Sequence, residues 1–486
     1  MVVCDISRIC SRKYTQVLAS LTGALIALSD GMQLGWSSPM VPRLLLPSSP
    51  VPIRKSEVVW IENAYLLGGL VGLWFTVYLS NKIGRKGAIL VGGCQSLLAW
   101  TIMSLSRDSW VLMLGRFIAG IGADINYVTT PMYIAEITHQ SRRGRLGCTV
   151  FVMMHIGTFL VYVIGPHIPI VTTSVIGAAV CVIQLLTFSV MPESPYYLIM
   201  KGHDKEAKDC LRILRDSANL EEEFDAMRDA VKEETTSPRR LRDLFQSKSN
   251  RKGLLLTVVL NILQDFTGCT VIVMNLHTIL SEFSPVGAPV AIIGIVFSIV
   301  LVISCATAGY LMDVVGRRKL LIVSCFLTSI NLFAIAAYLT VNITGIFTPH
   351  LEWVEYASLI IYAIVQQNGV GVIPNVIPAE LFPTNVRAYG CTAGDASFII
   401  GSALSIFLYH FIVKYVGMDV PFYMFAICSL FAGIFSIFVV PETTGKTLYE
   451  IQTMLNAGGS RRKRMYTSES KRKLNSNSPC ESDVDN

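Results

Sequence analysis

The chain has 486 residues, of which 52% are apolar and only 15% are charged, and its net charge is +6. Ordinary soluble domains carry roughly 25% charged residues, so this composition excludes a globular protein that covers itself with polar surface. A membrane protein is therefore the first expectation.

Apolar segments that can cross a bilayer recur along the chain, because about 20 apolar residues make one helical span. Strands are not expected, since an open strand leaves backbone groups unpaired in lipid. We predict an all-α membrane protein with twelve transmembrane helices, of which the second and eleventh are the least distinct. The predicted spans lie near 16–36, 58–79, 87–105, 110–133, 147–169, 171–191, 254–280, 288–312, 319–341, 355–379, 390–413 and 419–440.

The orientation follows from the lysines and arginines between the spans, which favour the cytosolic side. Residues 1–15 and the short loops on their side carry more of them than the opposite loops. The sequon that begins at Asn342 falls in an opposite loop, so Asn342 is a candidate glycosylation site. We expect a multi-pass plasma-membrane protein with both termini cytosolic, no cleavable signal peptide, and no structural disulfides among its 12 cysteines.

A charged stretch, 192–252, divides the spans into two sets of six. Its apolar residues are spaced as in short amphipathic helices at the membrane surface, and the alternative is a solvated linker. The predicted domains are listed here in chain order: a cytosolic N-terminus 1–15, a six-helix bundle 16–191, a helical linker 192–252, a second six-helix bundle 253–440, and a cytosolic tail 441–486 that is largely disordered after 458.

Three motifs recur in the same order in the two halves. "NKIGRKG" at 81–87 matches "DVVGRRK" at 313–319, and "PES" at 192–194 matches "PET" at 441–443. Between them, Glu136 precedes Arg143 by seven residues, and Glu380 precedes Arg387 by the same spacing. An ordered set of this kind indicates duplicated halves, which is typical of secondary transporters with a substrate site near the bilayer midplane.

The repeated charges fall where spans leave and enter the inner face of the membrane. We expect them to hold the inner gate shut, and as a partly buried network to bias a two-state equilibrium by roughly a few kcal/mol. The simpler alternative is that they only anchor helices at the interface. The predicted gating residues are Arg85, Glu136, Arg143, Glu193, Arg317, Arg318, Glu380, Arg387 and Glu442.

These motifs, together with "PMYIAEITHQSRRGRLG" at 131–147, "PESPYYL" at 192–198 and "PAELFPTNVRAYG" at 378–390, give the chain a family resemblance. It resembles the sugar porter family of the major facilitator superfamily, and most of all the insect facilitated trehalose transporters. The resemblance implies two pseudo-symmetric six-helix bundles, alternating access, a monomeric functional unit and no cofactor or metal. The gating charges of the family are all present.

The sugar site that the resemblance implies is altered. The family pattern in the seventh span is close to "QQxSGxN", whereas this chain has "QDFTGCT" at 264–270, and Leu301 stands where an asparagine is usual. Each neutral hydrogen bond contributes roughly 0.5–1.5 kcal/mol, so the cavity is rewritten while the gating machinery is kept. The candidate substrate-binding residues are Gln264, Asp265, Thr267, Thr270, Asn275, Asn375, Phe151 and Phe398.

Four acids, Asp30, Asp124, Asp265 and Asp395, fall within or near the spans. Ionisable groups at membrane depth are costly and suggest function. One interpretation is proton coupling through Asp30 or Asp265, and another is a counter-charge for a cationic or amine-bearing substrate. The third is that these acids are hydrogen-bonded to neighbours around a water-filled cavity.

No Walker loop, metal-ligand spacing or hydrolytic constellation is evident, so neither an enzyme nor ATP-driven transport is expected. The basic run "RRKRMYTSESKRK" at 461–473 favours anionic lipid as a partner, and the positive charge does not indicate nucleic-acid binding. We predict a transporter of a small polar solute, with a sugar such as trehalose or a hexose moved by facilitated diffusion. The alternatives are a proton-coupled or non-sugar carrier that uses Asp265 or Asp30, and a non-transporting solute sensor.

Overall fold

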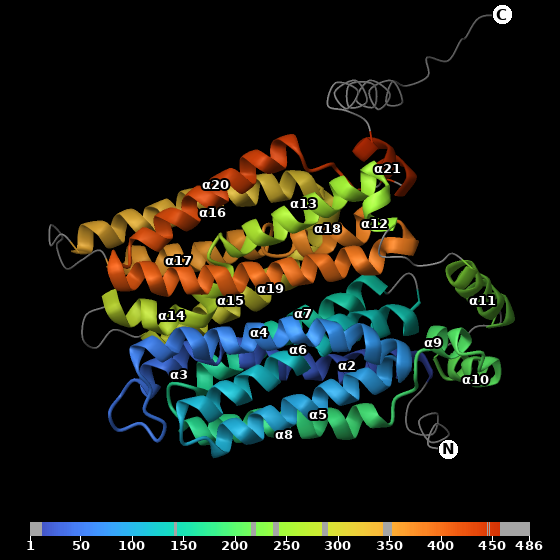
Figure 1. The fold of residues 1–486 in the computed structure, drawn as a ribbon, viewed down its shortest axis with the longest axis horizontal. Helices are drawn as coiled ribbons and strands as arrows, with labels where there is room; N and C mark the ends of the chain where they lie inside the picture. Colours follow the sequence, from blue (N-terminus) through green and yellow to red (C-terminus); the bar gives the residue numbers. More distant parts are fainter. Residues whose placement is uncertain are drawn as a thin grey trace, which may run out of the picture.

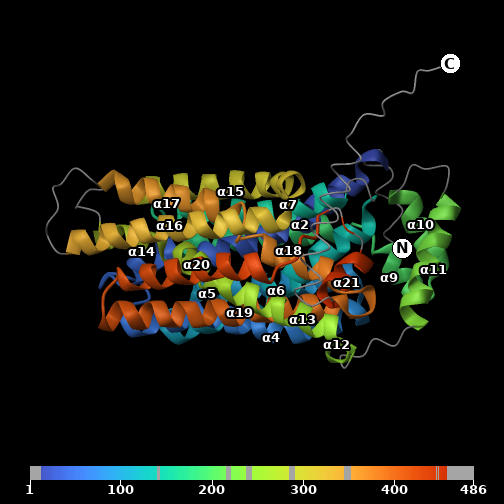
Figure 2. The same ribbon diagram turned by 90° about the horizontal axis from the view of Figure 1, so that it is seen from above.

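A computed structural model describes residues 12–139, 143–214, 220–236, 243–283, 290–343, 352–444, 446 and 448–456. Within these ranges the chain forms helices and no strand. Long helices run side by side in two stacked groups, the N-terminal half in blue to green and the C-terminal half in yellow to red (Figure 1). The view from above shows the same long axis for both groups (Figure 2). The predicted all-α membrane fold is confirmed.

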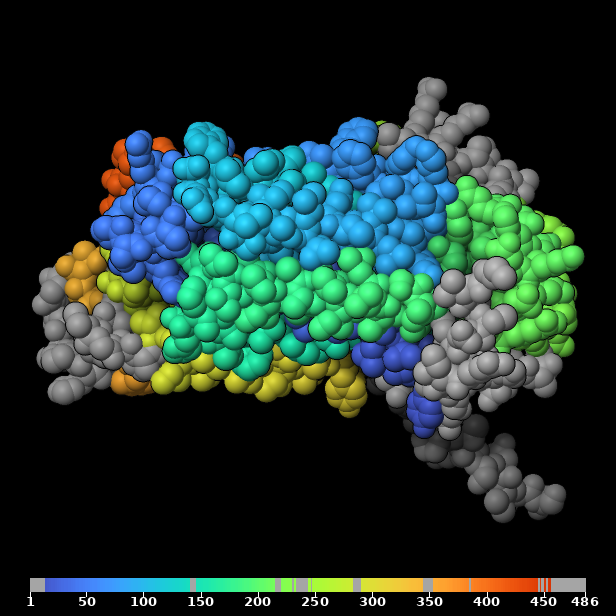
Figure 3. All heavy atoms as spheres, turned by 90° about the horizontal axis from the view of Figure 1, so that it is seen from below, coloured from blue at the N-terminus to red at the C-terminus, as the bar shows by residue number. Residues whose placement is uncertain are grey.

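The N-terminal half consists of apolar helices whose lengths suit a bilayer. Its helices are α2 (Arg12–Gly35), α3 (Ser37–Leu44), α4 (Lys55–Lys82), α5 (Gly84–Leu105), α6 (Ser109–Ile137), α7 (Arg143–Ile164) and α8 (Ile170–Ser189). The segment after it forms four short helices at one end of the molecule, and α9–α11 cover that end of the N-terminal half (Figure 3). These are α9 (Pro195–Met200), α10 (Asp204–Leu214), α11 (Leu220–Thr236) and α12 (Asp243–Gln246).

The C-terminal half repeats the arrangement, with two spans interrupted. Its helices are α13 (Lys248–Asp265), α14 (Cys269–Phe283), α15 (Val290–Val315), α16 (Arg317–Ile343), α17 (Glu352–Gln367), α18 (Ile373–Leu381), α19 (Thr384–Tyr415) and α20 (Val420–Phe438), followed by α21 (Leu448–Asn456). Asn342 is the second-last residue of α16. The α9–α12 segment and α21 lie at the same end of the molecule (Figure 1).

Eleven stretches of the described chain are long and apolar enough to cross a membrane as they stand. The tenth predicted span is instead split between α17 and α18, with residues 368–372 between them. Pro374 lies in the first turn of α18, where a helix does not need its backbone N–H. The seventh span breaks after α13, and Gly268 in the break has a φ of 83°. The split tenth span completes the predicted twelve.

Four glycines let helices of the N-terminal half approach backbone to backbone. A Cβ on Gly31 of α2 would lie 1.8 Å from the carbonyl oxygen of Met154, and α7 returns the contact through Gly157. Helices α4 and α6 meet in the same way through Gly68 and Gly120. Small residues are common at membrane helix contacts because dispersion between close backbones replaces the hydrophobic effect.

Large apolar side chains on the outside of the described chain face away from the core. Trp74, Leu186 and Phe438 are 83%, 68% and 75% exposed, as expected for residues that contact lipid. Trp110 and Trp353 lie in the first turns of α6 and α17 and are also exposed. Such tryptophans are typical of a membrane–water interface. The molecule is a multi-pass membrane protein.

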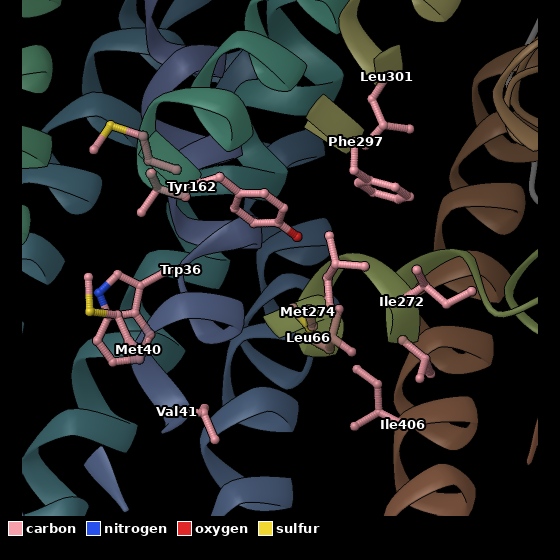
Figure 4. Packing of buried hydrophobic residues seen from close by; sticks show 14 of the residues in the cluster. Trp36, Met40, Val41, Leu66, Tyr162, Ile272, Met274, Phe297, Leu301 and Ile406 are labelled. Atoms are coloured by element: carbon pink, nitrogen blue, oxygen red, sulfur yellow. The ribbon is translucent and has the colours of Figure 1, made fainter. Parts of the chain in front are cut away.

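The buried apolar cluster crosses from one half to the other. In the close view, Tyr162 of the N-terminal half points toward Met274 and Phe297 of the C-terminal half, while Trp36 lies beside Met40 (Figure 4). The hydroxyl of Tyr162 donates a hydrogen bond to the carbonyl oxygen of Val273. The two halves therefore pack directly on each other.

Candidate functional site

A cavity of about 180 Å³ lies between the two halves and is lined by side chains from both. Helices α2, α4, α6 and α7 contribute to one side, and α13, α14, α15, α17, α18 and α19 contribute to the other. This is the location expected for a substrate site between duplicated bundles. The wall is largely apolar and carries a small number of polar groups, as ligand sites usually do.

Five of the eight candidate substrate-binding residues line this cavity: Gln264, Thr270, Asn375, Phe151 and Phe398. The amide Nε2 of Gln264 donates to the carbonyl oxygen of Gly371 at 2.7 Å. Gly371 lies in the break of the tenth span, and Gln264 stands just before the break of the seventh span. The backbone at one break therefore holds the Gln264 side chain at the other break. The Oε1 atom of Gln264 has no hydrogen-bond partner within the described chain.

The other three candidates do not line the cavity. Asp265 is buried against α19, where its Oδ1 accepts hydrogen bonds from Thr270 at 2.8 Å and Ser402 at 2.6 Å. The Thr267 hydroxyl donates to the carbonyl oxygen of Gln264, and the Asn275 amide donates to Glu62 at 3.3 Å. The sequence pattern predicts binding residues on one continuous helix. The chain instead turns at 266–268, and this turn directs these side chains away from the cavity.

Several cavity residues were not among the candidates. Gln366, Gln367, Tyr65, Tyr127 and His155 line the wall. The Nε2 atoms of Gln367 and His155 lie 2.9 Å apart and join the two halves. The dipeptide of glutamines in an otherwise apolar span was the signal that could have identified two of them.

Three of the four intramembrane acids line the cavity: Asp30 and Asp124 from the N-terminal half, and Asp395 from the C-terminal half. Asp124 accepts a hydrogen bond from the Thr76 hydroxyl at 3.1 Å. Asn126 and Ser96 approach Asp30, yet its Oδ1 has no hydrogen-bond partner within the described chain.

A first charge cluster lies at the end of the N-terminal half that α9–α11 cover, which we call the inner end, and the opposite end of the cavity is called the outer side. Arg85 Nη2 and Glu136 Oε1 form an ion pair at 2.9 Å, and both side chains are largely buried. Glu193 Oε1 accepts the backbone N–H groups of Arg85 and Lys86, each at 3.0 Å, at the N-terminus of α5. Burial raises the pKa of Glu193, while these N–H groups oppose the rise. Gly84 has a φ of 89°, and a Cβ there would meet Glu193.

A second cluster occupies the corresponding place in the C-terminal half. Arg317 forms ion pairs with Glu380 at 3.3 Å and Asp313 at 3.0 Å. Its backbone N–H donates to the Thr444 hydroxyl at 3.1 Å, which donates to Glu442 Oε1 at 2.7 Å. Gly316, like Gly84, has a positive φ, of 94°. The repeated motifs thus form two similar constellations.

The ion pairs do not follow the seven-residue spacing in the sequence. Glu136 pairs with Arg85 and Glu380 pairs with Arg317, in both cases across helices of the same half. Arg387 Nε donates to the carbonyl oxygen of Phe382 at 3.3 Å, and Arg318 Nη2 donates to that of Ile437 at 2.6 Å. The side chain of Arg143 lies outside the described residues. The gating roles of this set remain predictions.

The outer side of the cavity is crossed by polar contacts between the halves. His410 Nε2 of α19 and Glu62 Oε2 of α4 lie 2.9 Å apart, and the Glu62 side chain is fully buried. Nearby, the Ser38 hydroxyl and His277 Nδ1 are 2.7 Å apart. The charge clusters each lie within one half, whereas these contacts join the two halves.

We expect His410→Phe to open the outer side, because it removes a contact between the halves and leaves the buried Glu62 carboxyl with only the Asn275 amide among the described residues, a loss of about 1.5–3 kcal/mol. Spin labels on cysteines at Leu46 and Tyr415, both exposed at the outer side, would report longer distances. The exposed Cys94 and Cys148 would first be replaced by serine. Leu404→Ala, a lipid-facing change on the same helix, is the control; unchanged distances in His410→Phe would contradict the closing role.

Comparisons with known proteins agree with this geometry. The family model described as "Sugar (and other) transporter" matches residues 2–455. The Mus musculus protein "Solute carrier family 2, facilitated glucose transporter member 6" is 27% identical over 467 residues, with 90% of this chain and 91% of that protein covered. Facilitated trehalose transporter Tret1 of Bombyx mori is 28% identical over 456 residues, with 92% and 88% covered.

The fold comparison gives the same architecture. The inward open structure of the xylose transporter XylE from E. coli superposes with a TM-score of 0.70, covering 91% of this chain and 99% of that one. The identity is 19%, so this likeness supports the fold alone.

Proposed function

The chain belongs to the sugar (and other) transporter family, and from this premise we propose that it carries a sugar by facilitated diffusion with alternating access. It is a transporter rather than an enzyme. The observation that carries the proposal is the cavity between the halves, with outer contacts that join the halves and an inner charge cluster in each. Solute binds from one side, the halves rock, and the other side opens.

We favour a hexose over trehalose as the solute. The cavity of about 180 Å³ is small beside the roughly 300–1,000 Å³ of sites that hold drug-sized ligands. A monosaccharide could donate hydroxyl protons to Gln264 Oε1 and to the cavity acids, and accept from Asn375. The relatives named above include a glucose and a trehalose transporter, which is compatible with either sugar.

The proposal is tested by uptake of radiolabelled glucose and trehalose into proteoliposomes that contain the purified protein. We expect saturable, inhibitable glucose uptake that exceeds trehalose uptake about tenfold or more, because a tenfold preference needs only about 1.4 kcal/mol. Empty liposomes are the control. Specific binding of either sugar without flux would support the sensor instead, and the absence of both would overturn the proposal.

A second candidate is proton-coupled uptake through Asp30. Asp30 lines the cavity and has an oxygen without a hydrogen-bond partner within the described chain, whereas Asp265 is engaged away from the cavity. Uptake that rises with an inward proton gradient and loses this response in Asp30→Asn would favour coupling. Uptake indifferent to the gradient favours facilitated diffusion.

Location and partners complete the proposal. The protein acts in the plasma membrane as a monomer, with cytosolic termini and with the α9–α12 segment on the cytosolic side. The clustering of α9–α12 and α21 at one end of the molecule supports this orientation (Figure 1). The basic run 461–473, which we expect to contact anionic lipid, lies outside the described residues. Glycosylation of Asn342 remains a prediction for the opposite side.

A further inference from the structure

Three acidic side chains line the described cavity, and the only basic side chain beside them is that of His155. Asp30, Asp124 and Asp395 contribute to its wall, and no lysine or arginine does. Carboxylates in a largely apolar space are costly unless an opposite charge or hydrogen-bond donors compensate them. The wall itself supplies little of this compensation.

Two acceptor atoms on the described wall lack a hydrogen bond, although Asn126 and Ser96 approach Asp30. Asp124 receives the Thr76 hydroxyl, but Asp30 Oδ1 and Gln264 Oε1 have no hydrogen-bond partner within the described chain. Asp30 is 7% exposed and Gln264 is 1% exposed, so both are almost fully enclosed by the protein. The Gln264 oxygen is an observation independent of the acids, and it also indicates a ligand that donates protons.

The nearest arginine does not neutralise the wall. Arg116 is fully buried beside the cavity, and its guanidinium lies 4.7 Å from the ring centroid of Tyr65. Its N–H groups donate to the carbonyl oxygen of Gln33 and to the hydroxyl of Ser37. Arg116 therefore belongs to the outer contacts.

Aromatic rings on the same wall suit a cation. Tyr65, Tyr127 and Phe151 line the cavity, and the Tyr127 and Phe151 rings meet edge to face with centroids 5.8 Å apart. A cation over such a ring gains about 0.5–2 kcal/mol, depending on how well it is desolvated. The acids and the aromatic rings favour a ligand with a positive charge, and the unpartnered acceptors favour a ligand with hydrogen-bond donors.

We propose that the preferred solute is a sugar that carries a protonated amine, of the hexosamine class, with the ammonium group bound between Asp124 and Asp395. This inference rests on the proposed function and narrows its substrate class. The sugar hydroxyls donate to Asp30 and Gln264. Because Asp124 belongs to α6 and Asp395 to α19, the ammonium bridges the two halves and supplies the opposite charge that each acid lacks. Loading thereby favours the state in which both halves close on the solute.

The test compares uptake of radiolabelled glucosamine, glucose and N-acetylglucosamine into proteoliposomes at about pH 6, where a primary amine is protonated. We expect glucosamine uptake to exceed glucose uptake about tenfold, and acetylation of the amine to remove the preference. Asp124→Asn and Asp395→Asn should each lower glucosamine uptake about tenfold more than they lower glucose uptake, since a tenfold difference needs only about 1.4 kcal/mol. Asp108→Asn, an exposed acid at the start of α6, is the matched control.

The outcomes distinguish failure of the amine preference from failure of sugar transport itself. Glucose uptake without a preference for glucosamine, or equal losses for both sugars in the variants, would overturn the amine inference and leave sugar transport standing. Absence of uptake for all three sugars would overturn both. Should the variants fold poorly, thermal stabilisation of the wild-type protein decides: a larger shift with glucosamine than with glucose supports the inference, and an equal shift overturns it.

Discussion

Replacing Gly120 with valine should prevent the N-terminal half from assembling. A Cβ on Gly120 would lie 1.9 Å from the carbonyl oxygen of Tyr65 and 2.8 Å from the backbone nitrogen of Gly69. Both obstacles are backbone atoms of α4, so no side-chain rotation can relieve the overlap and the helices must separate. We expect a cost at or above the roughly 1–3 kcal/mol of ordinary overpacking.

The measurement is the yield of monodisperse protein in detergent and its thermal midpoint. Gly147→Val is the control, since a Cβ at Gly147 meets nothing within 4 Å. Gly147→Val should behave like the wild type, while Gly120→Val should aggregate or melt far earlier. Transport should fall with it, because α4 and α6 also carry the cavity residues Tyr65 and Asp124. A well-folded Gly120→Val protein would show that these helices can part without loss.

The fold could be predicted from sequence because span length and apolarity are properties of local composition. The second and eleventh spans, the least distinct in the sequence, became α4 and α19, helices of 28 and 32 residues. Their polar residues are buried against other helices, which composition cannot show. The break in the seventh span depends on Gly268 in a left-handed conformation. A single glycine in an apolar span does not allow this conformation to be predicted, because glycine adopts both signs of φ.

The site could be predicted less completely, for a reason visible at Asp265 and its neighbours. A motif gives the order of side chains along a helix, but the turn at 266–268 decides which of them face the cavity. Gln264 and Thr270 face it, whereas Asp265 bonds Ser402 on α19. The pairing of charges was hidden in the same way, because Arg85 and Glu136 are far apart in sequence and meet only when α5 packs on α6.

Removing Arg85 should abolish most transport while leaving the fold in place. The Arg85 side chain is 7% exposed and that of Glu136 13% exposed, so solvent does little to replace this ion pair. Arg85→Ala leaves the Glu136 carboxylate without its main partner, and breaking such a buried pair costs about 3–5 kcal/mol. Arg85→Ala therefore destabilises the conformation in which the cluster is intact, relative to the other conformation. Since about 1.4 kcal/mol is tenfold in an equilibrium, we expect transport to fall by at least about tenfold.

The pseudo-symmetric Arg317→Ala should act similarly but less strongly, because the Arg317 side chain is 18% exposed and its partner Asp313 is 73% exposed. Arg212→Ala is the matched control, since Arg212 pairs with Asp209 on the exposed surface of α10, where an ion pair contributes about 0–1 kcal/mol. Uptake per molecule at the surface is the measurement, with detergent stability to confirm folding. If Arg85→Ala transported at the wild-type rate, the cluster would only anchor helices; if Arg212→Ala failed as well, the loss would be one of assembly. Transport is lost in Arg85→Ala and kept in Arg212→Ala only if the Arg85–Glu136 pair takes part in the exchange between the outward-open and inward-open states.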